Sequence, residues 1–445
     1  MRVMSVFALS IVLSLLALRS SAAPIAVEFP PGLQVPAEAR PGPGFDVDKA
    51  TAAYLAMLTP GERARSDAYF EGGYWLQLWN WLYGVALAAV VLLSGLSRWI
   101  RDFARRVSPR PWLHTLVYGA IWIVAGFVLT LPFTIYAGFL REHEYGLSEQ
   151  PFLSWLGDRL KALGVGLILG SIVIAGVYAA LRRAGARWWI WATALVFAFN
   201  VAVGMIAPVF IAPLFNHYQP LPDGPVRDAV LSLARANQIP TDHVEWFDAS
   251  KQTTRISANV SGLWGTTRLS LNDNLLEHTS LPEIKAVLGH EMGHYVLSHT
   301  LELTVYLTIV FGAVFWIARF AFDRALLLWG ARFGVRDRGD PAGLPLLVAI
   351  VTTLLFLATP ILNGIVRSAE NQADAYGLNA AREPYGFAMV SMRLATYRKI
   401  MPGPVEELLF FDHPSGYERV HRAMVWLREN MSPRLSEEAA KAQSR

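Results

Sequence analysis

Long apolar stretches alternate with short polar segments over most of the chain. As helices rising 1.5 Å per residue, they are long enough to cross the roughly 30 Å hydrocarbon core of a bilayer. The alternative, helices buried in a soluble core, fits their length poorly. Aromatic residues that favour the membrane interface stand near the ends of these stretches: Tyr74, Trp75, Trp112, Trp188 and Trp189. The stretches cover residues 72–97, 112–140, 155–181, 188–215, 301–330 and 341–366.

The chain begins with a further apolar segment. Arg2 precedes an apolar run that ends in small residues at Ala22 and Ala23, a pattern typical of a secretory signal peptide. An uncleaved first membrane helix has the same pattern. The predicted fold class is therefore mainly α, a polytopic bundle of six or seven membrane helices.

Polar, turn-rich sequence interrupts the apolar pattern between residues 216 and 300. It predicts a helix over 226–236, a strand over 243–248 and a hairpin within 258–273, where polar and apolar side chains alternate. A small α+β domain should therefore accompany the bundle. The expected division is 1–23 signal peptide or first helix, 24–71 extramembrane segment, 72–215 four membrane helices, 216–300 α+β domain, 301–367 two further helices, and 368–445 C-terminal part of that domain with a flexible tail.

The composition agrees with a membrane protein and narrows the chemistry. Hydrophobic residues make up 53% of the chain and charged residues only 17%. The net charge is +4, and no nucleic-acid-binding motif accompanies it, so we expect no nucleic-acid partner. Cysteine is absent, which excludes disulfides and Cys-based metal sites. A metal would have to be bound by histidines and carboxylates.

Residues 290–294 read His-Glu-Met-Gly-His, on a helix that Ser280 and Glu283 are suited to cap. His290 and His294 are four residues apart and so project from one face, where both imidazoles can bind one Zn²⁺. Glu291 lies beside that face and can take a proton from a metal-activated water. A catalytic zinc needs a third protein ligand, so the motif alone does not decide the matter.

A second polar cluster supplies a candidate for that ligand. Asn363, Arg367, Glu370 and Asp374 share one face at the end of an apolar helix. Polar groups at the margin of a membrane helix are typically functional, although a surface salt-bridge helix is the alternative. Glu370 can be the third ligand. Asp374, one turn later, can accept the N–H of a ligating histidine.

A third cluster contains His413 and Arg419. His413 could donate to a developing oxyanion, and Arg419 could pair with a carboxylate near the site. Because His299 follows His294 by five residues, a continuous helix would turn it away from the ligand pair. The other histidines are expected to be structural or solvent-facing: His114, His143, His217, His243, His278, His299 and His421.

From about residue 70 to residue 430, the chain resembles the integral-membrane zinc CAAX prenyl proteases, the a-factor-converting endopeptidases, and their bacterial relatives. The resemblance rests on HEMGH, on the helix with Arg367, Glu370 and Asp374, and on His413-Pro414 followed by Arg419. It also rests on REHEYGLSEQPFLSWLGD (141–158), IAPLFNHYQPLPDGPVRDAV (211–230) and VEWFDASKQTTR (244–255).

The resemblance implies about seven membrane helices around a water-filled chamber, with a gluzincin protease domain facing it. It implies one zinc per chain, bound by His290, His294 and Glu370. Glu291 would be the general base, with His413 and Arg419 near the substrate carbonyl.

One departure concerns substrate binding. Where the family commonly has Asn-Ala-Tyr, this chain has Ser257-Ala258-Asn259, in a strand expected to pair with extended substrate. The chemistry is unaffected, but substrate preference is left open. The expected partner is a peptide or protein, lipidated or membrane-associated, in addition to the bilayer itself.

Two other classes of function compete with a zinc endopeptidase. One is a non-catalytic, zinc-binding membrane quality-control or binding protein, which would have no need of a base such as Glu291. The other is a transporter with a fortuitous motif, which would not explain Glu370.

Arginines concentrate in three short loops near residues 98–110, 182–187 and 319–338. Basic loops face the cytoplasm, so this distribution favours an extracytoplasmic active site. Together with the signal-like start, it predicts a multi-pass protein of a bacterial inner membrane.

Overall fold

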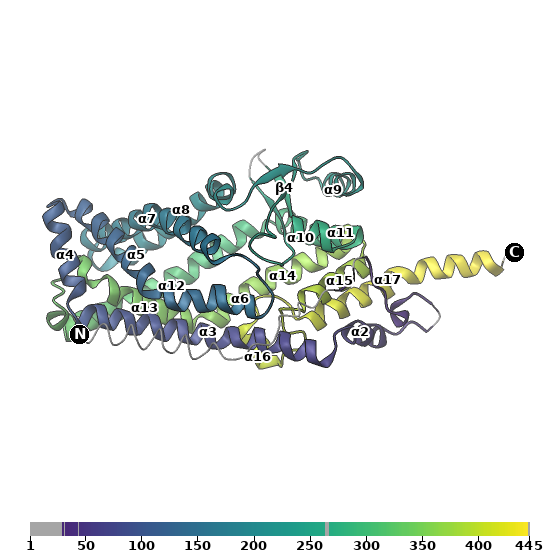
Figure 1. Ribbon diagram of the computed structural model, residues 1–445, viewed down its shortest axis with the longest axis horizontal. Coiled ribbons are helices and arrows are strands. Elements are labelled where there is room, and N and C mark those ends of the chain that lie inside the picture. Colours follow the sequence, from purple (N-terminus) through teal and green to yellow (C-terminus); the bar gives the residue numbers. More distant parts are fainter. Residues whose placement is uncertain (1–28, 31, 43, 263–266, 444–445) are drawn as a thin grey trace. The chain divides into compact units, whose positions relative to one another are not determined.

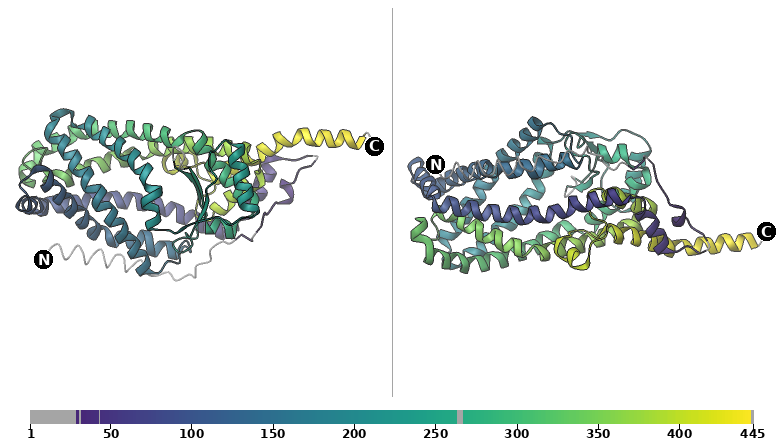
Figure 2. Two further views of the ribbon diagram at one scale, coloured as in Figure 1. Left: turned by 90° about the horizontal axis from the view of Figure 1, so that it is seen from above. Right: turned by 60° about the horizontal axis from the view of Figure 1, so that its bottom comes forward.

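The computed structural model describes residues 29, 30, 32–42, 44–262 and 267–443, with side chains as far as residue 430. The predicted signal peptide or first helix lies outside the described residues. The described chain forms two compact units, which are treated separately below (Figures 1 and 2). Of the described residues, unit 1 comprises 75–215 and 303–359, and unit 2 comprises those within 29–74, 216–302 and 360–443.

Among the described residues, five helical segments are long and apolar enough to span a membrane. They are Pro60–Leu93, Pro111–Glu144, Phe152–Arg183, Gly185–Leu214 and His299–Phe333. The helices that form them are α3 (Pro60–Leu93), α5 (Pro111–Ile135) continued by α6 (Arg141–Glu144), α7 (Phe152–Arg183), α8 (Trp188–Ile206) and α12 (His299–Phe333).

The apolar stretch predicted over 341–366 is not one straight helix. It is divided between α13 (Leu344–Leu357) and α14 (Thr359–Ala381), which bend by 55° at their junction. Pro360 explains the break, because proline has no N–H to donate to the preceding turn and its ring crowds that turn. The pair counts as a sixth, broken span if it crosses the membrane as one.

Unit 1 is a helical bundle in which α5 packs on α7 and α7 on α8. Its core buries Tyr118, Tyr178, Trp188 and Phe322. Helix α4 (Leu96–Val107) occupies the first arginine-rich segment, and its buried Arg101 pairs with Asp340 at 2.7 Å. Other helices of this unit expose large apolar side chains, as expected for a membrane bundle.

Unit 2 contains a four-stranded sheet in the order β1-β2-β4-β3. Its strands are β1 (Tyr218–Pro220), β2 (Val244–Phe247), β3 (Ala258–Ser261) and β4 (Arg268–Asn272). Strand β3 pairs antiparallel with β4 and is an edge strand of this sheet. A core of mostly aliphatic side chains joins the sheet to α9 (Pro225–Ala236) and α11 (Leu281–Val296).

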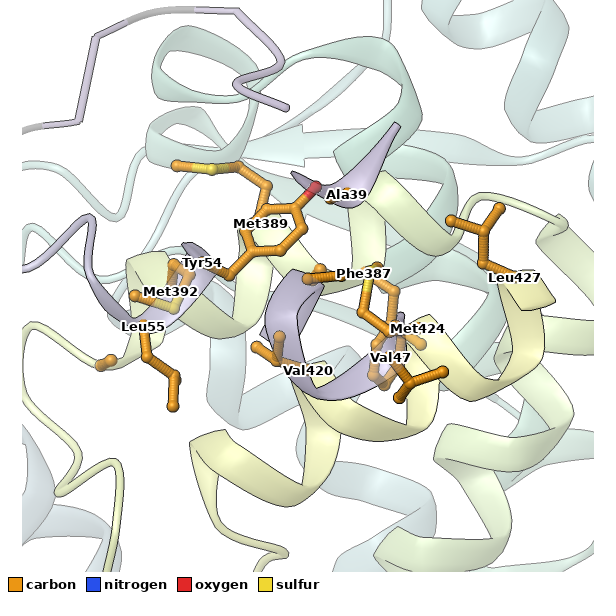
Figure 3. Packing of buried hydrophobic residues seen from close by; sticks show 14 of the residues in the cluster. Ala39, Val47, Tyr54, Leu55, Phe387, Met389, Met392, Val420, Met424 and Leu427 are labelled. Atoms are coloured by element: carbon orange, nitrogen blue, oxygen red, sulfur yellow. The ribbon is translucent and has the colours of Figure 1, made fainter. Parts of the chain in front are cut away.

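A second core in unit 2 brings together segments from both ends of the chain. Helix α2 (Val47–Leu55) packs on α15 (Pro384–Leu394) and α17 (Gly416–Gln443). Figure 3 shows Tyr54, Phe387 and Met424 among the buried side chains of this cluster. Unit 2 also contains two short helices, α10 (Asp273–His278) and α16 (Pro404–Phe410), the first part of α3 and nearly all of α14.

Candidate metal centre

Helix α11 carries the His-Glu-Met-Gly-His motif and is fixed at its start. Ser280 and Glu283 form a capping box, with the Glu283 carboxylate 2.7 Å from the Ser280 amide nitrogen. The same carboxylate is fully buried and pairs with Arg393 of α15. Because both ends of this contact are buried, the pair ties the motif helix to α15.

Glycines allow α11 and α14 to cross in backbone contact. A Cβ at Gly377 would lie 2.7 Å from the His290 amide nitrogen, closer than real Cβ atoms approach. A Cβ at Gly293 would lie 3.1 Å from Cα of Ala373. Only residues without a side chain fit at such a crossing. The crossing brings residues about 80 positions apart into one site.

Three side chains from these helices converge. The Nε2 atoms of His290 and His294 are 3.1 Å apart. The Glu370 carboxylate lies 3.2 Å from His290 Nε2 and 3.4 Å from His294 Nε2. Ligand atoms about 2.0–2.1 Å from a tetrahedral zinc are about 3.3 Å from one another. These residues therefore fit a zinc ion in both donor type and spacing.

Asp374 and Arg419 support His290 from behind. Asp374 is fully buried, and its Oδ1 accepts the Nδ1–H of His290 at 2.8 Å. Arg419 holds both oxygens of that carboxylate, at 2.6 and 3.0 Å. Burial alone would lower the pKa of His290, but hydrogen bonds to Asp374 and Glu370 raise it to about 9. Protons therefore compete with a metal for His290.

Glu291 and His413 stand on the side of the cluster that faces a cavity. Burial of the Glu291 carboxyl raises its pKa, against the lowering effect of His290 and His294. His413 Nε2 is 3.3 Å from Glu370, and its Nδ1 is 2.8 Å from Asp412. A carboxylate of raised pKa next to a metal site is suited to exchange protons with substrate.

The cavity extends from Glu291 and His413 to the start of strand β3, where Ser257 and Ala258 line it. Asn259 does not line the cavity; it lies opposite Ser270 of β4. The rest of the lining is part apolar and part polar. Ile256 precedes β3, Ala286 and Val287 belong to α11, and Phe387, Val390 and Leu394 belong to α15. The polar part comes from Tyr397 and Arg398, which follow α15, and from His290 and Arg419 of the metal centre.

The orientation of β3 follows from its ladder. The Asn272 amide donates to the Ser257 carbonyl, and the Ser257 amide donates to the side-chain Oδ1 of Asn272, both at 3.0 Å. Both main-chain groups of Ser257 thus point toward β4, as in a hydrogen-bonded pair of the ladder. Such pairs alternate along antiparallel strands. The N–H and C=O of Ala258 therefore point away from β4, toward the side of β3 on which no further strand lies among the described residues.

Asn363 and Arg367 do not join the ligand cluster. Asn363 donates to the Leu409 carbonyl at 2.9 Å, and Arg367 donates to the carbonyls of Glu407 and Phe411. These bonds hold the last turn of α16 and Phe411, which lies two residues before His413. The two side chains therefore hold in place the chain segment that carries His413.

The expectation that His299 faces away from the ligand pair is wrong. Its Nδ1 lies 2.9 Å from Nδ1 of His294, and the residue is fully buried. The reason is local: α11 ends at Val296, Ser298 adopts a φ of 58°, and α12 begins at His299. The prediction from helical spacing missed this contact because no proline or glycine indicates in the sequence that the helix ends between His294 and His299.

Comparison with known proteins gives concordant matches. Residues 49–217 match the model of the CAAX prenyl protease N-terminal domain, with five membrane helices, and residues 220–426 match peptidase family M48. An uncharacterized metalloprotease of Bacillus subtilis, YhfN, is 29% identical over 83% of this chain and 87% of its own length. The CAAX prenyl protease 1 homolog of Arabidopsis thaliana is 27% identical over 82% and 88%, respectively.

The fold has a counterpart among solved structures. The crystal structure of S. mikatae Ste24p superposes with a TM-score of 0.68 at 22% sequence identity, covering 83% of this chain and 89% of that one. The predicted fold class, a mainly α membrane bundle with a small α+β part, is thereby confirmed. The two family models, in tandem, account for most of the chain from residue 49 to residue 426. This chain is a multi-pass membrane metalloprotease that belongs to peptidase family M48.

Proposed function

We propose that the metal is one zinc ion per chain, bound by His290, His294 and Glu370, and that Glu291 is the base that activates water. The observation that carries this proposal is the triangle of ligand atoms, 3.1 to 3.4 Å on a side, with Glu291 next to it. A non-catalytic zinc protein would not need a protonatable carboxyl at that position.

When bound, zinc would polarise the scissile carbonyl and lower the pKa of a water molecule at the site. Glu291 accepts the proton of that water and passes it to the leaving amine. His413 donates a hydrogen bond to the oxyanion that develops on the carbonyl oxygen. Arg419 acts through Asp374, by fixing the carboxylate that orients His290.

The substrate is an extended peptide that adds to the open edge of β3. The outward N–H and C=O of Ala258 would form the main-chain pairs, and Ser257 and Asn259 flank that position. The apolar part of the cavity lining, Val287, Phe387, Val390 and Leu394, offers contacts to apolar substrate side chains next to the cleaved bond. Membrane-associated chains, lipidated or not, are the substrate class that fits a protease of this kind.

The direct test is cleavage of a panel of quenched peptides, prenylated and unprenylated, by wild type and Glu291→Gln, with bound zinc quantified in both. We expect wild type to cleave and the variant to retain zinc but lose cleavage. Normal cleavage by Glu291→Gln would disprove the assigned mechanism. Equal rates on both peptide types would show that a prenyl group is not recognised.

We further propose a bacterial inner-membrane location with the active site on the extracytoplasmic side. Helix α12 begins one residue after the α11–α12 break and ends at Phe333, within the third arginine-rich segment. If that end is cytoplasmic, the end at His299 lies across the membrane.

A further inference from the structure

His294 and His299 share a hydrogen bond between two ring nitrogens. Their Nδ1 atoms are 2.9 Å apart, and the rings meet at 71°. An N–H···N contact holds one proton, which belongs to one ring or to the other. The opposite nitrogen of His294, Nε2, points at Glu370 and His290.

The position of that proton decides whether His294 can bind a metal. A neutral imidazole ligates through its unprotonated nitrogen, so Nε2 is free only when Nδ1 carries the proton. His294 must then donate, and His299 Nδ1 must accept. The proton of His299 is consequently on Nε2.

Gln372 completes the chain. Its Oε1 lies 3.4 Å from His299 Nε2, and an amide oxygen can only accept. In the orientation that the structure gives the Gln372 amide, Oε1 accepts from His299 Nε2, which leaves His299 Nδ1 as the acceptor for His294.

This arrangement differs from that of the other histidine ligand. His290 donates to Asp374, a carboxylate whose charge Arg419 balances. His294 donates to a neutral, fully buried ring instead. A neutral chain avoids placing another buried carboxylate beside Glu370.

We propose that His299 and Gln372 are positioning residues that hold His294 in the tautomer whose Nε2 binds the metal. The inference rests on the proposed zinc site. Neither residue touches substrate; both act through His294, and their effect should appear as zinc affinity.

The test is zinc affinity by competition with a chelator, in full-length protein in detergent. We expect His299→Phe to weaken zinc binding by about 10- to 100-fold, as loss of the partner of a metal-bound histidine typically does. In His299→Asn, the amide oxygen can take the place of Nδ1 as acceptor, so affinity should return close to that of wild type. A loss of packing alone would not be restored by the shorter, polar asparagine.

Gln372 provides a second, milder pair of variants, because its side chain is exposed. Gln372→Leu removes the acceptor and should weaken zinc binding, whereas Gln372→Glu retains an acceptor and should not. His114→Phe is the matched control: it also removes a buried imidazole, but from unit 1, and should leave zinc affinity unchanged.

Equal zinc affinity in His299→Phe and wild type would overturn the inference, as would a His299→Asn variant no better than His299→Phe. If His299→Phe does not fold, the comparison of Gln372→Leu with Gln372→Glu decides in the same way. A wild-type protein that binds no zinc would contradict both the proposed function and this inference. The variant results above would contradict this inference alone, so the two failures are distinguishable.

Discussion

At the scale of single residues, the centre depends on a buried charge pair that never touches the metal. Asp374→Asn would leave the His290 N–H with a neutral acceptor and Arg419 without its buried partner. We expect zinc affinity to fall by about 10- to 100-fold and stability by about 3–5 kcal/mol. Chelator competition and denaturant unfolding measure the two effects. Full zinc affinity in this variant would contradict the assigned role of Asp374.

His413 should behave differently, because it acts on the transition state. His413→Phe removes the donor assigned to the oxyanion. We expect kcat to fall by about 10²- to 10³-fold, with KM and zinc content little changed. Steady-state kinetics beside metal analysis separates the two effects, and a loss of zinc would reassign His413 to metal binding.

Much of the site was visible in the sequence, since helical spacing alone places His290, His294 and Glu291 together and Glu370 near Asp374. The separation of residues in the sequence predicts which side chains share a face only within one uninterrupted helix. It failed at His299, where the backbone turns at Ser298, and it could not show that Asn363 and Arg367 bind carbonyl groups of α16. Contacts of that kind are set by tertiary packing, which no local pattern encodes.

At the scale of elements, the crossing of α11 and α14 sets the distance between the ligands. Gly377→Ala would push the helices apart, because its Cβ would meet main-chain atoms that cannot give way. We expect this variant to lose zinc and activity. Gly364→Ala on the same helix has nothing within 4 Å of its Cβ and should retain both. The test is the amount of zinc bound per chain in the two purified variants. If Gly377→Ala binds as much zinc as wild type, the crossing tolerates a side chain.

The edge of β3 offers a test of how substrate binds. Ala258→Pro removes an N–H that points away from β4, so the β3–β4 ladder is retained. We expect zinc content to be unchanged and kcat/KM for peptides to fall by about tenfold, the effect of losing one hydrogen bond in an otherwise intact ladder. Unaltered kcat/KM would exclude strand addition at Ala258.

At the scale of the whole molecule, the arginine-rich segments predict the orientation in the membrane. A reporter that fluoresces only in the cytosol, fused to the C-terminus, should give no signal if the metal centre is extracytoplasmic. The same reporter inserted after Ala184, between α7 and α8, should fluoresce and serves as the control. Strong fluorescence from the C-terminal fusion would reverse the proposed topology.

Metal removal is a further test on the whole protein. Zinc would link α11 to α14, so a chelator should abolish cleavage and lower the thermal midpoint, and added zinc should restore both. At a free concentration of 100 times Kd, a bound ion stabilises a fold by about 2.7 kcal/mol. An unchanged midpoint would mean that the folded state gains nothing from the ion.

The open edge of β3 has a consequence for how substrates are chosen in the cell. Under the proposed mode of binding, a peptide would pair with that edge only while its own main-chain N–H and C=O groups are unpaired, which excludes residues held in a helix or a sheet. The amino-acid sequence of a substrate segment would then affect its cleavage less than the fraction of time that the segment is unfolded. Cleavage rates should follow the equilibrium between the folded and the locally unfolded state of each target segment. The protease would then select its substrates by their local stability.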